Sequence, residues 1–178
     1  MILPYNLNYF TMPEEFKKEM QLKESIFSPR ETIEQVEEGD LLCPKFNNEG
    51  LIPCIITDCV SNEVLMHAYM NNESFQLTIE TGEGHYWSRS RNILWKKGAS
   101  SGMIHKVQEI LVDDDQDSIW LKVDVRGIGS SCHVGYKSCF YRSVEYLKEG
   151  KVNLKFTETE KVFDPDIVYS GSDNPTKL

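Results

Sequence analysis

The sequence predicts an α+β protein that is mostly β, and three patterns support this prediction. Apolar residues alternate with polar ones over residues 119–125, which is the period of a strand with one buried face. The runs IPCIIT and EVLMHAYM have strand composition, and the polar stretch DCVSN between them suits a hairpin turn. One short helix is expected over NNESFQLTIETG, because its less polar residues share one helical face.

A helical extension is expected at the amino terminus, over residues 1–45. The segments Thr11–Glu14 and Ser28–Glu31 both have the spacing of a capping box, in which side chains satisfy the first free amides of a helix. Pro29 at the first helical position and Gly39 after the last turn support the second of these helices.

The core domain is expected over residues 46–145. Its helix should have Asn71 or Asn72 as the N-cap, because asparagine side chains accept hydrogen bonds from free amides, and it should end at Gly82. The segment HYWSRSR should then resume extended structure.

A third region is expected over residues 146–178. The segments VNLKF and VFDPDIV have the composition of edge strands, and SGSDNPTKL has the composition of a frayed tail.

Composition narrows the class of partner. The 178 residues carry a formal net charge of −9 and a pI near 5.0, whereas nucleic-acid-binding proteins usually present a basic face. The first ten residues lack the pattern of an export signal, and no apolar run is long enough to span a membrane. Five scattered cysteines suit a reducing compartment better than a disulfide framework. We therefore expect a cytoplasmic protein that binds neither nucleic acid nor membranes.

The stretch LVDDDQDSIW places four carboxylates within five positions at the start of a predicted strand. One interpretation is a solvated turn. A second is a calcium loop, since Asp113, Asp115 and Asp117 match its D-x-D-x-D opening, but a serine stands where that loop needs glycine. A third is that these alternate residues of an extended segment face one way and share a divalent ion, while Asp114 points elsewhere.

The segment SSCHVGYKSCFYR carries two cysteines seven residues apart, Cys132 and Cys139. Cysteine is commonly a buried apolar residue, so the pair does not by itself indicate a metal. Thiolates nevertheless favour zinc, and a catalytic zinc needs only three protein ligands, so two cysteines and one carboxylate would suffice. His133 would then lie close to a zinc-bound water and could transfer its protons, although a lone histidine is more often structural.

The segment HYWSRSRNILWKKGASSG mixes aromatic and basic residues in a chain that is otherwise acidic. Its Ser-Arg-Ser-Arg alternation predicts that Arg89 and Arg91 share one face of a strand, where guanidinium groups could hold a phosphate. Phosphate binding combined with aromatic stacking suggests a nucleotide ligand. The alternative is a charged exposed strand followed by a turn, with the tryptophans in the core.

Taken together, these stretches resemble the phosphoribosyl-AMP cyclohydrolase family, in its single-function form. The resemblance runs from about Leu51 to Arg142 and is carried in order by GLIPCIITD, EVLMHAYMN, HYWSRSRNILWKKG, SSG, the D-x-D-x-D run and CHVGYKSCFYR. It implies an intertwined homodimer with zinc sites shared between subunits and magnesium near a small-molecule nucleotide. It also implies hydrolytic opening of the N1–C6 bond of N1-(5-phosphoribosyl)-AMP by a zinc-activated water, a step of L-histidine biosynthesis.

The resemblance also implies roles for individual residues. The magnesium aspartates of the family match Asp113, Asp115 and Asp117, and two of its three zinc cysteines match Cys132 and Cys139. His133 is then expected to be the catalytic proton shuttle. The residues expected to bind substrate are Trp87, which would stack on the base, and Arg89, Arg91, Lys97, Ser100 and Ser101, which would hold phosphate.

The third zinc ligand departs from the family pattern, which has cysteine where this chain has Asp114. A carboxylate oxygen is an acceptable zinc donor, so we expect Asp114 of one subunit to complete the site made by Cys132 and Cys139 of the other. His105 is the rival third ligand, because it stands where the family tends to have glutamine.

Two other functions remain open at this point. One is a non-catalytic binding module in which metal only joins a dimer, and the other is a hydrolase of the same fold that acts on another purine nucleotide. Deamination of adenine is disfavoured, because the H-x-E and P-C-x-x-C motifs of the zinc nucleobase deaminases do not occur here.

Overall fold

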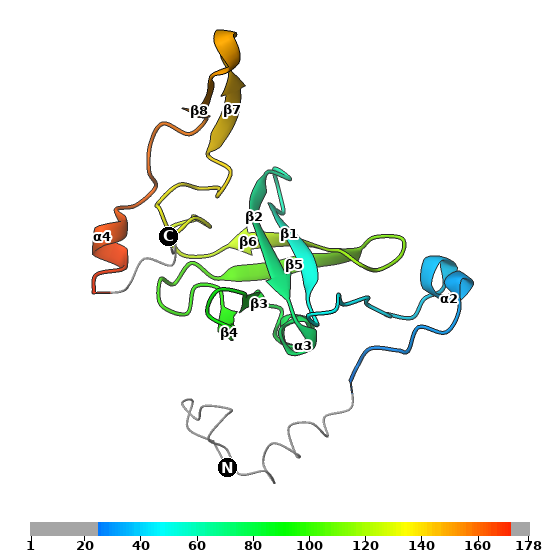
Figure 1. Ribbon diagram of the computed structural model, residues 1–178. Helices are drawn as coiled ribbons and strands as arrows, with labels where there is room; N and C mark the ends of the chain where they lie inside the picture. The colour runs from blue at the N-terminus through cyan, green and yellow to red at the C-terminus, as the bar shows by residue number, and fades with distance from the viewer. Residues whose placement is uncertain (1–24, 172–178) are drawn as a thin grey trace, which may run out of the picture.

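The computed structural model describes residues 25–171. In that range the chain forms strands joined mostly by short turns, with a few short helices (Figure 1). The elements in chain order are α2 (Ile33–Glu38), β1 (Ile52–Asp58), β2 (Val64–Met70), α3 (Asn72–Thr81), β3 (His85–Ser88), β4 (Ile93–Lys96), β5 (His105–Val112), β6 (Ile119–Val125), β7 (Arg142–Tyr146), η2 (Lys148–Gly150), β8 (Val152–Phe156) and α4 (Pro165–Val168).

Six of these strands form one sheet in the order β4-β3-β2-β1-β6-β5. Neighbouring strands are antiparallel except β1 and β6, which run parallel. The helix α3 packs beside β2 and β3, as Figure 1 shows. This arrangement confirms the predicted α+β, mostly β fold class. No helix among the described residues has both the length and the apolar composition that crossing a bilayer requires.

One face of the sheet is the hydrophobic core. On β6, Ile119, Leu121 and Val123 have no exposed surface, which confirms the alternation predicted from the sequence. Fully burying such a side chain contributes roughly 1.5–3 kcal/mol. The same core receives Ile52, Cys54, Ile56, Leu65, Met70 and Phe75 from β1, β2 and α3.

The opposite face of the sheet carries aromatic side chains. Residues paired across antiparallel strands point to the same face, so Tyr69 of β2 and Trp87 of β3 lie together on this side. Trp120 of β6 is aligned with Ile55 of β1 on the same face, and its indole Nε1 donates a hydrogen bond to Thr57 Oγ1 at 2.8 Å. This face therefore carries aromatic side chains outside the hydrophobic core.

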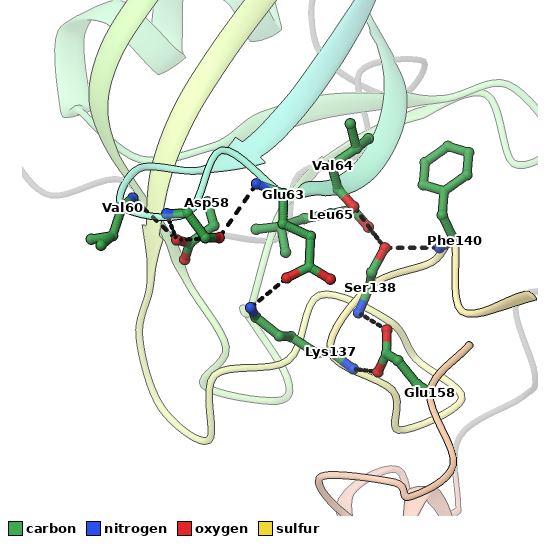
Figure 2. A network of polar contacts seen from close by, with 10 residues as sticks. Asp58, Val60, Glu63, Val64, Leu65, Lys137, Ser138, Phe140 and Glu158 are labelled. Carbon is green, nitrogen blue, oxygen red and sulfur yellow. Dashed lines mark hydrogen bonds and ion pairs between the residues drawn. The ribbon is translucent and has the colours of Figure 1, made fainter. Parts of the chain in front are cut away.

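The β1–β2 hairpin and the helix α3 have the predicted ends. The carboxylate of Asp58 accepts hydrogen bonds from the amides of Val60 and Ser61, at 3.1 and 2.8 Å, which closes the turn (Figure 2). At α3 the Asn71 side chain accepts from the Ser74 amide at 2.9 Å, and Gly82 ends the helix with φ +64°.

The amino-terminal helix prediction is partly wrong. The helix α2 has Thr32 rather than Ser28 as its N-cap, with Gln35 as the reciprocal partner, and it ends before Gly39 as expected. The capping box forms at Thr32 and Gln35 because the Gln35 side chain also accepts from the amide of Glu31 and donates to the carbonyl of Pro29. The Ser28–Glu31 segment therefore stays outside the helix. The predicted Thr11–Glu14 cap lies outside the described residues.

Two strand predictions are also corrected. Arg89 and Arg91 lie in the turn between β3 and β4, not on a strand, because Asn92 adopts φ +52° and reverses the chain. VNLKF is the strand β8, as predicted, but VFDPDIV contains the helix α4, which starts at Pro165 with Asp164 as its cap.

The hairpin of β7 and β8 is a separate two-stranded sheet that projects from the rest of the molecule (Figure 1). All its strand residues are exposed.

Candidate active site

The two candidate zinc cysteines lie in contact in one chain. The thiols of Cys132 and Cys139 are close enough to interact, and this interaction lowers the pKa of Cys132 to about 6 while raising that of Cys139. The loop between them is closed by a hydrogen bond from the Gly135 amide to the Cys132 carbonyl at 3.1 Å. Gly135 has φ +102°, and a Cβ there would approach the Phe163 carbonyl to 2.5 Å, so only glycine fits.

A network of polar contacts attaches this loop to the edge of β2 (Figure 2). The Cys139 amide donates to the Leu65 carbonyl at 2.7 Å, and Ser138 Oγ donates to the Val64 carbonyl at 2.7 Å. The Glu158 carboxylate accepts from the amides of Lys137 and Ser138, at 2.8 and 3.0 Å. The position of the second thiol is thus set by residues far away in the sequence.

His133, next to Cys132, has a buried ring nitrogen with nothing to bond. Its Nε2 atom is inaccessible and has no hydrogen-bond partner among the described residues. Burial, followed by the charge of Lys97, lowers the pKa of the imidazole, so its neutral form is favoured. A buried, unpaired nitrogen on the residue that follows Cys132 fits a site that binds a further group.

Lys97 lies beside the thiols. Its side chain is buried, and burial lowers its pKa while the nearby Cys139 and Cys132 oppose that effect. The pocket that Arg89 and Arg91 line does not include Lys97. The structure therefore separates Lys97 from the arginines with which the sequence grouped it.

His105 has no exposed surface, and both of its ring nitrogens are in hydrogen bonds. Nδ1 lies 2.9 Å from the Tyr86 hydroxyl and Nε2 lies 2.9 Å from Ser131 Oγ. Burial, with a smaller contribution from Lys97, lowers the pKa of His105 to about 3. Neither nitrogen is free to bind a metal unless one of these bonds breaks.

The acidic run is the turn between β5 and β6. One oxygen from each of Asp113, Asp115 and Asp117 lies within 4.8 Å of the others. The segment is not extended, so the carboxylates converge because the chain turns: Asp113 Oδ1 accepts from the amides of Asp117 and Ser118, both at 2.9 Å. Asp114 is exposed and is not in this group.

Among residues 25–171, no third His, Cys, Asp or Glu lies close enough to form a group with the two thiols. If zinc binds there, the cysteine pair of a single chain would provide two of the three protein ligands that a catalytic zinc needs.

Gln116, in the middle of the acidic turn, is buried and binds a segment that precedes β1. Its Oε1 accepts from the Cys43 amide at 2.7 Å, and its Nε2 donates to the Val36 and Leu41 carbonyls at 3.0 and 3.2 Å. Its carbonyl accepts from the Lys45 amide at 2.8 Å. We call residues 36–45 the N-terminal strap.

A pocket of about 190 Å³ lies at β2, β3 and β4, and its lining includes Tyr69 and Trp87 of the aromatic face. The Arg89 guanidinium lies 4.1 Å from the centre of the Tyr69 ring, and Arg91 Nε donates to Ser88 Oγ at 3.1 Å. Trp87 and both arginines line this pocket, although the arginines come from a turn. The lining is His67, Ala68, Tyr69, Trp87, Ser88, Arg89, Arg91 and Trp95.

Ser100 and Ser101 lie in the tight turn between β4 and β5. Gly98 has φ +83°, and a Cβ there would meet the Ile104 amide nitrogen at 2.5 Å, so the turn depends on this glycine. Ser100 is exposed, Ser101 Oγ accepts from the Met103 amide at 3.4 Å, and neither lines the arginine pocket.

Sequence reasoning missed several residues of this region. His67 and Tyr69 are alternate residues of a predicted strand, so their shared face was a usable signal for a pocket. Lys45, Gln116 and Glu158 act through partners at least 20 residues away, and no local pattern marks them.

Comparison with known proteins shows that this chain belongs to a class of hydrolytic enzymes. The family model for phosphoribosyl-AMP cyclohydrolase matches residues 66–141. A phosphoribosyl-AMP cyclohydrolase of Rhodopseudomonas palustris (strain BisB18) is 49% identical over 142 residues, covering 80% of this chain and 96% of that protein. That of Sinorhizobium fredii is 48% identical over 80% of this chain and 93% of its own, and that of Bradyrhizobium sp. (strain ORS 278) is 52% identical over 71% and 95%. The chain belongs to the phosphoribosyl-AMP cyclohydrolase family.

Proposed function

We propose that this protein hydrolyses the N1–C6 bond of the adenine ring of N1-(5-phosphoribosyl)-AMP, a step of L-histidine biosynthesis, in the cytoplasm. Family membership supports the substrate. The observation that carries the chemistry is the close approach of the Cys132 and Cys139 thiols, together with the buried, unpaired Nε2 of the adjacent residue His133.

Cys132, Cys139 and Asp114 would hold zinc, with Asp114 coming from a second copy of the chain. Two facts support a shared site: the described part of one chain offers the thiols no third ligand, and Asp114 is exposed. The two hydrogen bonds of His105 favour Asp114 over this rival. The protein would therefore act as a homodimer.

Zinc bound to such ligands lowers the pKa of water to roughly 7, which makes a nucleophile available at neutral pH. The water oxygen would add at C6 of the adenine and become the carboxamide oxygen as the N1–C6 bond breaks. One water proton would go to N1 and the other to the exocyclic nitrogen, which becomes the carboxamide NH2. The product is a ring-opened formimino carboxamide.

The chain's own residues supply proton transfer and binding. The neutral imidazole of His133 takes the proton from water and returns it to N1, which its lowered pKa favours because the neutral form is the base. Trp87 stacks on the base, and Arg89 and Arg91 hold phosphate at the pocket beside Tyr69.

Asp113, Asp115 and Asp117 would hold magnesium, since three converging carboxylate oxygens suit a hard divalent cation. The ion would neutralise phosphate charge and place the substrate. Lys97, which is buried beside the thiols, would bind the substrate near the reacting ring. Ser100 and Ser101 would contact phosphate from their turn.

The test is to incubate the full-length protein with N1-(5-phosphoribosyl)-AMP and follow the ultraviolet band of the product. We expect turnover that a zinc chelator abolishes and added zinc restores, and that Cys139→Ser loses. Cys59→Ser, at a cysteine outside the site, is the matched control and should retain activity. Absence of turnover in zinc-loaded protein would reject the proposed reaction, and chelator-resistant turnover would reject the zinc mechanism.

A further inference from the structure

The ammonium group of Lys45 lies among the carboxylates of the acidic turn. Its Nζ atom is 2.7 Å from Asp115 Oδ2 and 3.3 Å from Asp117 Oδ2. These are two of the three carboxylates that we propose for magnesium. A full positive charge therefore already contacts two of the carboxylates that a divalent cation would have to bind.

The backbone of Lys45 is fixed to the same turn. Its amide donates to the carbonyl of Gln116, and the Gln116 side chain binds the strap at Val36, Leu41 and Cys43. The ammonium can leave the carboxylates only by the length of its own side chain. Tethering of this kind keeps its effective concentration at the turn high.

Lys45 also differs from the other lysines that form ion pairs in the described range. Lys96, Lys122 and Lys137 each pair with a single glutamate, namely Glu83, Glu109 and Glu63. Lys45 instead bridges two carboxylates that belong to a converging group of three. An isolated exposed pair has little effect on stability, but an ammonium inside a cation site competes directly with the cation.

We propose that Lys45 is a tethered counter-cation that occupies the Asp113–Asp115–Asp117 group and sets its affinity for magnesium. The ammonium reduces repulsion among the three carboxylates when no metal is present. When Mg²⁺ binds, the Lys45 side chain moves into solvent while the strap stays attached through Gln116. This inference rests on the proposed function, in which the aspartates bind magnesium.

The inference predicts an unusual direction of change: removing a polar contact should strengthen binding. In Lys45→Met, Mg²⁺ no longer has to displace two exposed ion pairs of the ammonium, and the repulsion between the ammonium and Mg²⁺ is gone. These changes correspond to roughly 3- to 10-fold tighter Mg²⁺ binding. Lys45→Arg keeps the charge and should stay within about twofold of wild type. Lys137→Met removes a lysine paired with Glu63, away from the acidic turn, and should not change the affinity.

The experiment is isothermal titration of the full-length protein with MgCl₂ alone, for wild type and these three variants. Lys45→Gln is titrated as well, so that a folding defect of one neutral variant does not decide the result. Tighter binding in the neutral variants but not in Lys45→Arg is the expected result. Equal or weaker binding in the neutral variants, with measurable binding in wild type, would overturn the role of Lys45.

A different result would reject the proposed magnesium site itself. If wild type and every Lys45 variant fail to bind Mg²⁺, the aspartates are not a magnesium site, and the Lys45 inference falls with them. Asp115→Asn separates the cases further, because it should weaken binding in both the wild-type and the Lys45→Met background if the site is correct.

Discussion

The Tyr86 hydroxyl lies 2.9 Å from Nδ1 of His105, in a position closed to solvent on both sides of the bond. Because burial lowers the folded-state pKa of His105 to about 3, the folded protein keeps this ring neutral while the unfolded chain takes up a proton below about pH 6.5. The stabilisation is fully present above pH 6.5 and is lost as the pH falls toward 3.

This pairing predicts the pH dependence of stability. The free energy of unfolding of wild type should fall by up to about 1.4 kcal/mol per pH unit between pH 6.5 and 3 because of this residue. His105→Gln keeps a donor and an acceptor but does not titrate. The free energy of unfolding of this variant should therefore fall with pH less steeply than that of wild type, by up to the same slope. Urea unfolding of both proteins at pH 7, 6 and 5 measures the difference. If the free energies of unfolding of the two proteins decline in parallel as the pH falls, His105 does not have the lowered pKa.

Replacing the oxygen donor at the proposed zinc site should change zinc affinity. Asp114→Cys supplies a softer thiolate ligand, so we expect zinc to bind roughly tenfold tighter or more, and Asp114→Ala should weaken it by a similar factor. Competition with a chromogenic chelator gives the affinities. Asp166→Cys, which adds a thiol on the exposed helix α4, controls for non-specific binding. If Asp114→Ala binds zinc as wild type does, Asp114 is not a ligand.

The Glu158 carboxylate bridges the consecutive amides of Lys137 and Ser138, as Figure 2 shows. The next residue in the chain is Cys139. Glu158→Ala should lower the free energy of unfolding by about 2 kcal/mol, because both amides lose a charged acceptor. It should also reduce zinc retained after dialysis, since the loop that holds the thiol is released. The Glu158→Gln side chain can accept from one amide only, so both measurements should lie between those of wild type and Glu158→Ala. Glu160→Ala, at an exposed neighbour, should leave both measurements unchanged.

Arg89 should contribute to substrate binding more than to the chemical step. Loss of a charge-assisted hydrogen bond to phosphate in Arg89→Met predicts a KM at least about tenfold higher with kcat within about threefold. Steady-state kinetics separate the two constants. Arg126→Met removes an arginine that pairs with Asp124 instead, and its kinetics should match wild type. A fall in kcat alone would contradict a phosphate-binding role.

The strands were predictable because their signal is local. The alternation at Ile119–Val125 and the cap of α3 at Asn71 depend on residues a few positions apart. The Asp164-Pro165 pair was also a local signal, since aspartate caps and proline begins a helix, and it should have outweighed the strand composition of VFDPDIV.

The site was only partly predictable, for a physical reason. The motifs named the cysteines, aspartates and arginines, but three-dimensional contacts decide what each side chain meets. Lys97 is close to Arg89 and Arg91 in sequence yet is buried beside the thiols, while Lys45 reaches carboxylates 70 residues further along. Such contacts leave no periodic or spacing signal in the chain.

The bonds of Gln116 to the strap also constrain the order of assembly during translation. The side chain of Gln116 joins positions that precede it by 73 to 80 residues. At roughly 5–20 residues per second, the ribosome adds that length in about 4 to 16 seconds, whereas hairpins form in microseconds. The strap is therefore synthesised 73 to 80 residues before its anchor, and the acidic turn can bind Lys45 only after the turn itself has been made.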